Sequence, residues 1–150
     1  MNPSENASEP TRQLVIFGLG SEEYALAIGE VQEIIRYVAP RTVASDADWI
    51  LGVISLRGKI IPVCDLAKRL GVPRSEARAA KIIVVEAGEH VVGLVVDDVT
   101  EVLTVDEGEI ETLRVAGSRG ANSIAKVGER LIVLLESESI FDNASLSDAV

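Results

Sequence analysis

The stretch VIFGLGSEEYALAIGEVQEII, residues 15–35, returns in altered form as IVVEAGEHVVGLVVDDVTEVL, residues 83–103. Both contain a strand-like run, a glycine turn, a second strand-like run and an acidic-Val-x-Glu-apolar ending. At an offset of 68 residues, identical or similar residues align at six positions: Gly20 with Gly88, Leu26 with Leu94, Glu30 with Asp98, Val31 with Val99, Glu33 with Glu101, and Ile34 with Val102. The chain is therefore predicted to consist of two copies of one structural unit.

Each copy is predicted to contain about five strands, which is few enough to close into a small barrel without exposed sheet edges. The first hairpins are expected to join residues 14–17 to 24–28 in one copy and 82–86 to 91–96 in the other. A later turn at Gly58 has its counterpart at Gly128, at an offset of 70. The predicted fold class is all-β, mainly strands with short helices, arranged as two duplicated barrels packed together.

The composition is typical of a small globular protein. Of the 150 residues, 47% are hydrophobic and only 3% are aromatic, so aliphatic side chains must form the core. No apolar run approaches the roughly 20 residues of a membrane-spanning helix, and the N-terminus lacks the features of a secretion signal. A single cysteine, Cys64, fits a reducing compartment, and we expect a cytoplasmic protein.

Three segments are distinguished along the chain. Residues 1–11 are polar and expected to be disordered, residues 12–141 form the folded domain, and residues 142–150 form a polar tail. Within the domain, Val115–Ser123 is expected to be a flexible loop between the last strands.

One short helix is predicted, over Leu66–Leu70. Asp65 is suited to cap its N-terminus, and Gly71 can take the left-handed conformation that follows the last turn. Pro73 prevents the helix from continuing.

The net charge of −10 is unevenly distributed along the chain. Residues 1–35 carry one base and six acids, residues 36–81 carry nine bases and four acids, and residues 82–150 carry four bases and fourteen acids. A basic middle third between acidic flanks predicts protein partners of complementary charge. Nucleic acid is not expected as a partner, because phosphates need a basic surface and single strands also need aromatic side chains for stacking.

The side chains that catalysis requires are scarce. The single histidine, His90, is expected in an exposed hairpin turn, and Cys64 among apolar neighbours is typical of a buried structural residue. One histidine and one cysteine cannot form a His/Cys metal site. The acidic clusters at 97–101 and 106–111 lack the spacing of a calcium-binding loop, and Gly18-x-Gly20 lacks the third glycine of a dinucleotide fingerprint. The sequence predicts neither an enzyme nor a bound cofactor or metal.

The stretch GVISLRGKIIPVCDL, residues 52–66, predicts a tight hairpin. Apolar runs flank Arg57-Gly58-Lys59, and Gly58 is expected to supply a positive φ. Pro62 lacks an N–H donor, so we expect it at a sheet edge or a bulge, on a side that is open to partners or locally twisted. Arg57 and Lys59 should point outward, either as solubilising turn residues or as part of a partner-binding surface.

The same stretch, together with EEYALAIGEVQEII (residues 22–35) and VVGLVVDDVTEVL (residues 91–103), resembles the CheW family of chemotaxis coupling proteins. The family pattern G-V-[IT]-x-L-R-G-x-[IV]-[IV]-P-[IV]-x-D-L is met throughout, with Ser55 where asparagine is common. The resemblance extends from about Gln13 to Glu136. It implies a pair of five-stranded SH3-like β-barrels, with strand exchange between them left open, and an adaptor rather than an enzyme.

The resemblance also implies partners and contact residues. Family members bridge the histidine kinase CheA, through its regulatory domain, and the cytoplasmic tips of methyl-accepting chemotaxis proteins. By motif, the receptor-binding residues are Val31, Glu33, Gly52 and Arg57. Val31 would offer apolar area, Glu33 and Arg57 would fix the register by charge, and Gly52 would allow a close backbone approach. The protein is then expected in the cytoplasm, recruited to membrane-bound receptor arrays without inserting into the membrane.

Structural explanations compete with these roles. Val31 can belong to the core, Glu33 can pair with Arg36 on the surface, and Gly52 can ease the entry into a strand. The recurrence of Glu33 as Glu101 indicates a structural duty common to both copies. Arg57 instead aligns with Val127. The hairpin therefore does not require an arginine, and we assign Arg57 to the partner surface.

Other function classes remain open. A barrel that binds a small ligand or an oligonucleotide is disfavoured by the acidic balance and the scarce aromatics, and an enzyme is disfavoured by the single His and Cys. Because the same domain closes chemotaxis kinases and is fused to receiver domains, a fragment of a larger protein is a further alternative. A stand-alone adaptor is preferred.

Overall fold

A computed structural model describes residues 10–73, 81–112 and 121–141, and most of these lie in strands. Most of the expected N-terminal tail, the C-terminal tail and residues 115–120 of the expected loop fall outside the described residues. The strands are β1 (Thr11–Leu19), β2 (Glu22–Ala27), β3 (Val31–Arg36), β4 (Ile50–Leu56), β5 (Lys59–Asp65), β6 (Lys81–Ala87), β7 (His90–Val96), β8 (Asp98–Asp106), β9 (Ile110–Thr112), β10 (Ala121–Val127) and β11 (Arg130–Leu135). The short helical elements are η1 (Ile28–Glu30), α2 (Leu66–Leu70), η2 (Glu107–Glu109) and α3 (Ser137–Ile140).

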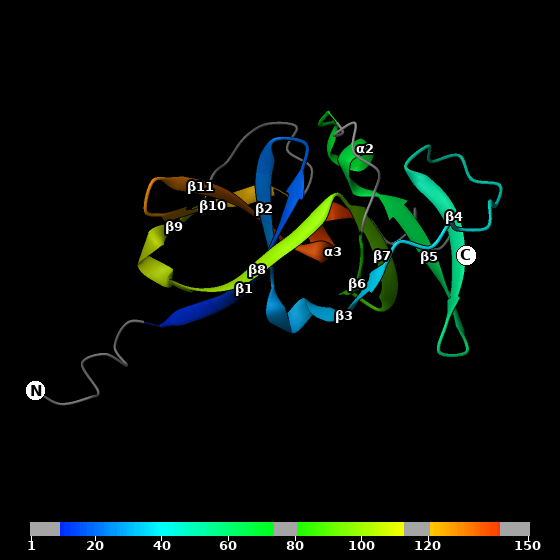
Figure 1. The fold of residues 1–150 in the computed structure, drawn as a ribbon, viewed down its shortest axis with the longest axis horizontal. Helices are drawn as coiled ribbons and strands as arrows, with labels where there is room; N and C mark the ends of the chain where they lie inside the picture. The colour runs from blue at the N-terminus through cyan, green and yellow to red at the C-terminus, as the bar shows by residue number, and fades with distance from the viewer. Residues whose placement is uncertain (1–9, 74–80, 113–120, 142–150) are drawn as a thin grey trace, which may run out of the picture.

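The strands form two curved sheets, shown in Figure 1. Barrel A is the six-stranded sheet in the order β8-β1-β2-β11-β10-β9, and barrel B is the five-stranded sheet in the order β3-β6-β7-β5-β4. The predicted β fold with two packed barrels is confirmed. Barrel A has one strand more than expected because the short β9 pairs with β10, whereas barrel B has only a single bridge between Arg41 and Val53 at the matching place.

The two copies exchange their first hairpins. The hairpin β1–β2 from the first copy lies in barrel A with β8–β11 of the second copy, and β6–β7 lies in barrel B with β3–β5 of the first. Parallel pairing of β2 with β11 and of β5 with β7 makes the exchange reciprocal. Each barrel therefore contains strands from both copies.

The pairing registers correct one detail of the correspondence between the copies. The turns lie between paired residues, which are Leu56 with Lys59 in one hairpin and Val127 with Arg130 in the other. Arg57 thus corresponds to Gly128, not to Val127. The sequence alignment that matched Gly58 with Gly128 is shifted by one residue, because Gly58 is the second residue of its turn and Gly128 is the first.

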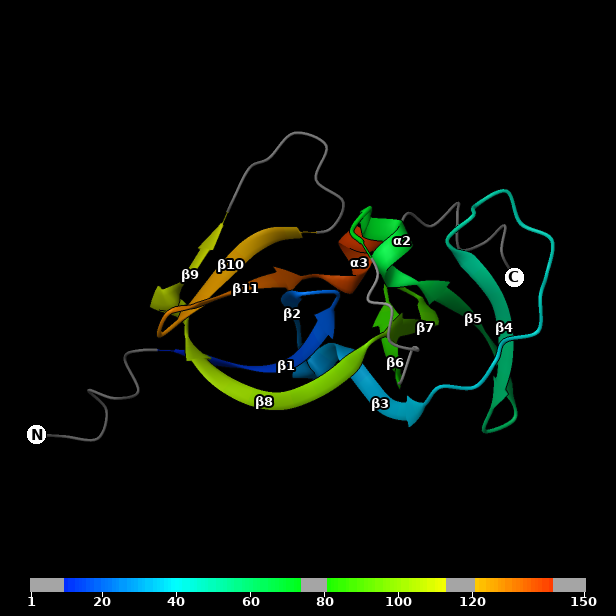
Figure 2. The ribbon, with the colours of Figure 1, turned by 45° about the horizontal axis from the view of Figure 1, so that its top comes forward.

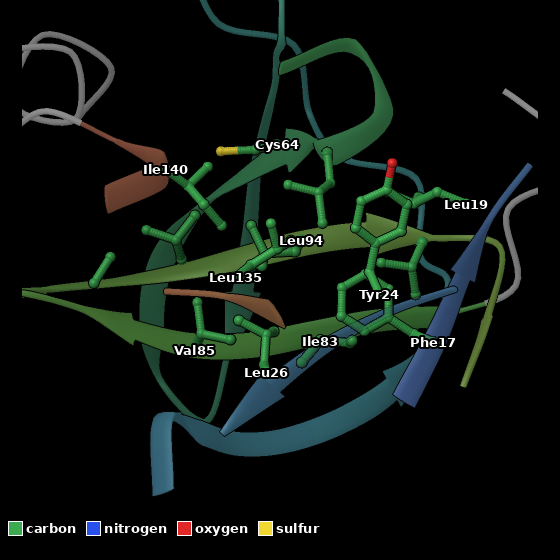
Figure 3. Close-up of a cluster of buried hydrophobic side chains, with 14 of the residues drawn as sticks. Phe17, Leu19, Tyr24, Leu26, Cys64, Ile83, Val85, Leu94, Leu135 and Ile140 are labelled. Carbon is green, nitrogen blue, oxygen red and sulfur yellow. The ribbon is translucent and has the colours of Figure 1, made fainter. Parts of the chain in front are cut away.

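Apolar side chains form three clusters, one inside each barrel and a larger one between the barrels. Figure 3 shows this third group, the interbarrel cluster, in which Phe17 and Leu26 from barrel A meet Ile83 and Leu94 from barrel B. Fully burying a side chain of this kind contributes about 1.5–3 kcal/mol. The shared cluster therefore holds the two barrels together as one packed unit.

Helix α2 has the ends that the sequence predicts. The side chain of Asp65 accepts a hydrogen bond from Lys68 N at 3.2 Å, and Gly71 follows the helix with a φ of 76°. By contrast, β1 begins at Thr11, within the segment expected to be disordered, and β10 includes the end of the expected loop. Helix α3 was not predicted, because no capping side chain marks its start. None of the described helices is long and apolar enough to cross a membrane.

The two side chains weighed for catalysis occupy structural positions. His90 is the first residue of β7 and pairs with Ala87, so it stands just beyond the turn expected for it. Cys64 is buried in the interbarrel cluster, and its burial raises the pKa of the thiol. Within the described ranges, no group of His, Cys, Asp and Glu is placed to hold a metal ion.

Candidate functional site

The predicted receptor-binding residues all lie in barrel B. Strand β3 carries Val31 and Glu33, β4 carries Gly52, and Arg57 and Gly58 form the turn between β4 and β5. Strands β3 and β4 are the two outer strands of this sheet. Curvature of the sheet brings its two edges close enough for Glu33 to contact Arg57.

Glu33 and Arg57 form a bidentate ion pair between the two edges. Arg57 Nε donates to Glu33 Oε2 at 2.8 Å, and Arg57 Nη2 donates to Glu33 Oε1 at 2.9 Å. The fork of guanidinium N–H groups matches the two oxygens of a carboxylate in this geometry. Glu33 thus pairs with Arg57 and not with Arg36, the surface partner considered from the sequence. The ion pair links the ends of the sheet and orients both side chains.

A β-bulge sets the direction of Glu33. Val31 pairs with Val85 on β6 and Glu33 pairs with Val84, so Gln32 is an extra residue in the ladder. A bulge of this kind twists the strand and changes the direction of the side chains around it. Gln32 Nε2 also donates to the carboxylate of Glu86 at 3.2 Å, which ties the bulged residue to the neighbouring strand.

The ion pair is stabilised in its charged form and is open to solvent on one side. The hydrogen bond from Arg57 lowers the pKa of Glu33, and the same bond raises the pKa of Arg57. The side chain of Arg57 is 75% exposed, whereas that of Glu33 is 25% exposed. A guanidinium carries more N–H donors than the two that Glu33 accepts. Arg57 can therefore bind an acceptor on a partner without leaving Glu33.

Arg57 has a backbone conformation that arginine does not favour. Its φ is 53°, and it is the one non-glycine residue with positive φ in the described parts of the chain. Gly58 follows with a φ of 80°, so both central residues have the positive φ of a type I′ hairpin turn. A side chain in this region costs about 1–2 kcal/mol. The geometry of the turn therefore does not explain an arginine at this position.

Gly52 is buried beneath the segment that precedes β4. Its φ is 152°, and a Cβ atom here would collide with the carbonyl oxygen of Arg41. Arg41 N donates to Val53 O at 2.8 Å and Val53 N donates to Arg41 O at 2.9 Å, which holds that segment against the strand. The close backbone approach expected at Gly52 occurs within this chain, and its contact with a receptor remains a prediction.

Apolar side chains that are exposed or half-buried lie on β3, on η1 just before it and on the equivalent strand β8. Val31 is half-buried and packs against the interbarrel cluster. Ile28, Ile34 and Val102 are exposed by 41%, 39% and 51%. Ile34 and Val102 are counterparts in the repeat, on β3 and β8, and these strands run along the same side of the molecule in Figures 1 and 2. The sequence-based site omitted these three residues, although the repeat already aligned Ile34 with Val102.

The hairpin β4–β5 projects beyond the rest of barrel B, as Figure 1 shows. Strand β5 pairs with β7 only from Val63 onward, so its first residues pair with β4 alone. The expectation that Pro62 stands at a sheet edge or a bulge, on an open side, is wrong, because Pro62 is buried in an interior strand. It lies one residue before the pairing with β7 begins, so its missing N–H donor interrupts no pairing with that strand. Near the tip, Ile60 is 66% exposed, and its counterpart Leu131 in barrel A is 61% exposed. Neither residue was singled out from the sequence.

Barrel A contains a related ion-pair network. Arg130 donates to Glu23 through Nε at 3.0 Å and Nη2 at 2.8 Å, and to Glu101 through Nη2 at 2.8 Å. The hydrogen bond from Arg130 lowers the pKa of Glu23. Glu101 is the repeat counterpart of Glu33, so this glutamate accepts hydrogen bonds from an arginine at a hairpin end in both barrels.

Comparisons with known proteins extend this description. Residues 13–145 match the family model of the CheW-like domain. A chemotaxis protein CheW of Bacillus subtilis is 32% identical over 143 residues, which cover 92% of this chain and 92% of that protein. A chemotaxis protein CheW of Klebsiella aerogenes is 33% identical over 143 residues, which cover 91% of this chain and 85% of that protein.

A solved structure is similar as well. The crystal structure of the scaffolding protein TtCheW from Thermoanaerobacter tengcongensis matches with a TM-score of 0.83 and 34% identity, over 91% of this chain and 97% of that one. The match with the family model covers most of the chain, including the ion pair and both hairpins that flank the interbarrel cluster. The chain therefore belongs to the CheW-like domain family.

Proposed function

We propose that this protein is a chemotaxis adaptor, a non-catalytic scaffold that couples methyl-accepting chemoreceptors to the histidine kinase CheA. Its family membership and its similarity to a scaffolding protein support a role of this class. The observation that carries the proposal is the Glu33–Arg57 pair. The pair holds an exposed guanidinium at the tip of a projecting hairpin. The backbone of Arg57 has a positive φ, which is unfavourable for arginine.

The receptor is proposed to bind along β3 and the tip of the β4–β5 hairpin. A receptor helix with one apolar face can cover Val31 and Ile34 while an acidic side chain reaches Arg57. Glu33 keeps the guanidinium in place, and Gly52 acts indirectly by allowing the preceding segment to close against β4.

The regulatory domain of the kinase is proposed to contact a site apart from the turn residue Arg57, on strands β5 and β11 of the two hairpins. Ile60 in barrel B and Leu131 in barrel A are exposed at matching places, and their hairpins lie at opposite ends of the molecule in Figure 1. Burial of these two aliphatic side chains by a partner would contribute free energy to binding. Two such ends allow the adaptor to join its neighbours within an array in the cytoplasm, below the membrane that holds the receptors.

Titration calorimetry with a receptor cytoplasmic-tip fragment and with the kinase regulatory domain tests this arrangement. Arg57→Ala is expected to weaken receptor binding by about 2 kcal/mol or more, because the receptor's acidic group loses its partner. The affinity of the Arg57→Ala variant for the kinase domain should not change. Ile60→Asp should have the opposite selectivity. Both side chains are exposed, so the melting temperature of each variant should stay close to that of the wild type.

Arg12→Ala serves as the matched control. It breaks another exposed arginine–glutamate pair, Arg12 with Glu107 at 2.7 Å in barrel A, and should leave both affinities unchanged. If Arg57→Ala bound the receptor as tightly as the wild type, Arg57 would be only a turn residue. Binding of single-stranded DNA by a protein that binds neither fragment would favour the oligonucleotide-binding alternative.

A further inference from the structure

The segment Glu136–Phe141 connects the two barrels, and we call it the C-terminal strap. Strand β11 ends at Leu135 in barrel A, where that residue pairs with Leu26 of β2. The chain then continues onto barrel B, where α3 packs against β6. Figures 1 and 2 both show α3 at the centre of the molecule, between the two barrels.

Two apolar residues anchor the end of the strap. Ile140 is fully buried in the interbarrel cluster and points toward its other side chains in Figure 3. Phe141 is 6% exposed, and its ring centroid lies 5.3 Å from that of Trp49. The guanidinium of Arg69 from α2 lies 5.0 Å from the centre of the Trp49 ring. The strap is thereby held against Trp49 in the segment before β4, and the same ring is contacted by Arg69 of α2.

A buried serine anchors the beginning of the strap. Ser137 is 1% exposed, and its hydroxyl donates to the backbone oxygen of Glu86 on β6 at 2.6 Å. The backbone N–H of Ser137 donates to Glu30 Oε1 at 2.9 Å. One residue of the strap thus contacts both β6 and η1.

The contact with Glu30 matters because η1 is a single short turn at the surface. None of its three residues is buried, and no side chain caps its start. Ile28 is 41% exposed, and the space where a Cβ atom of Gly29 would stand is open. On the solvent side, a cavity of about 330 Å³ lies between η1 and the strap. The next residue after Glu30 is Val31, where β3 begins.

We propose that the C-terminal strap positions strand β3 for partner binding, through the hydrogen bond from Ser137 to Glu30. Glu30 and Ser137 are positioning residues, since the bond fixes η1 and with it the start of β3, which carries Val31 and Glu33. The effect on receptor affinity rests on the proposed function, whereas the effect on β3 itself does not. Releasing the strap leaves β3 paired with β6 but lets its entry move.

Hydrogen exchange of the β3 amides tests the proposal in the full-length protein. Glu30→Ala removes the acceptor, and Glu30→Gln restores an oxygen that can accept the same bond. Glu30→Ala is expected to speed exchange at Val31–Glu33 by about threefold or more, with little change in β8, while Glu30→Gln stays close to the wild type. For receptor binding, Glu30→Ala should weaken the affinity by about threefold or more and leave kinase binding unchanged.

A matched control separates positioning from general loss of stability. The control is Ile132→Val, a substitution in the core of barrel A that is expected to lower the melting temperature at least as much as Glu30→Ala. Amide exchange in β3 should not become faster in this variant. Unchanged exchange at Val31–Glu33 in Glu30→Ala would overturn the proposal. If exchange changed as expected but the wild type bound no receptor fragment, the positioning role would stand and the proposed adaptor function would fail.

Discussion

At the scale of single residues, Gly52 and Gly58 illustrate two different requirements for glycine. Both have a positive φ, at 152° and 80°. A side chain at position 52 would also collide with the backbone of Arg41, whereas the space beside Gly58 is open. Gly52 is therefore needed for packing as well as for its backbone conformation.

Gly52→Ala is expected to destabilise the protein by about 3 kcal/mol or more, because strain at positive φ adds to overpacking against backbone that must move. Gly58→Ala, the matched control, should cost only about 1 kcal/mol. Urea unfolding followed by the fluorescence of the single tryptophan, Trp49, measures both variants. Equal stabilities would show that the segment at Arg41 does not close against β4.

The family resemblance named both Glu33 and Arg57, and the repeat gave Glu33 a counterpart in Glu101, but neither paired the two residues. Their contact depends on the curvature that brings the outer strands of barrel B together, and no local pattern encodes this contact between residues 24 positions apart. The burial of Gly52 was equally inaccessible, because it depends on where a preceding irregular segment lies.

At the scale of elements, ion pairs hold strand ends together in both barrels. In barrel A, Arg130 at the start of β11 binds Glu23 on β2 and Glu101 on β8. This one arginine therefore ties three strands together. The equivalent place in barrel B is occupied by Lys59, and Arg57 contacts the glutamate there instead.

The network in barrel A is expected to make stability depend on pH. The pKa of Glu23 is lower in the folded protein than its ordinary value of 4.5, because Arg130 donates a hydrogen bond to the carboxylate. This stabilisation is fully present above the ordinary pKa and is lost as the pH falls through the lower, folded value. Arg130→Met should therefore be less stable than the wild type at pH 6, and the gap should narrow at pH values below 4.5.

Urea midpoints of both proteins across this pH range measure the gap. Arg12→Met, which breaks the exposed pair of Arg12 with Glu107 in the same barrel, provides the control. A gap of constant size between pH 6 and pH 3 would contradict the hydrogen bond between Arg130 and Glu23.

Strand and turn positions followed closely from the sequence, while the smallest elements did not. Alternating apolar residues and glycine turns predicted the four hairpins, and Asp65 and Gly71 predicted the limits of α2. Helix α3 has no capping side chain and is stabilised by burial of Ile140 between the barrels. An element held mainly by tertiary packing carries little local signal.

At the scale of the whole molecule, the exchanged hairpins and the interbarrel cluster make the barrels depend on each other. Barrel A is built from both ends of the described chain and encloses its own cluster, while the largest cluster is shared. The duplication could be predicted from sequence because the repeat preserves local patterns. The exchange could not, because exchanged and unexchanged hairpins have the same local pattern.

Leu135→Ala is expected to destabilise the entire molecule by about 2–5 kcal/mol, since Leu135 is fully buried in the interbarrel cluster. Leu131→Ala on the same strand removes the same atoms from an exposed position, and should change stability by no more than about 0.5 kcal/mol. Circular dichroism and Trp49 fluorescence should report one coincident transition in each variant. Two separate transitions would mean that the barrels unfold independently.

Formation of a ternary complex is the decisive test of the proposed adaptor role. An immobilised receptor-tip fragment is incubated with the kinase regulatory domain, with and without this protein, and the retained kinase domain is quantified. The kinase domain is expected to be retained only when the adaptor is present. Retention should be lost with the Arg57→Ala variant and with the Ile60→Asp variant. The Ile60→Asp variant should itself remain bound to the receptor fragment. A kinase domain that displaces the adaptor from the receptor, or that is retained equally without it, would contradict the account.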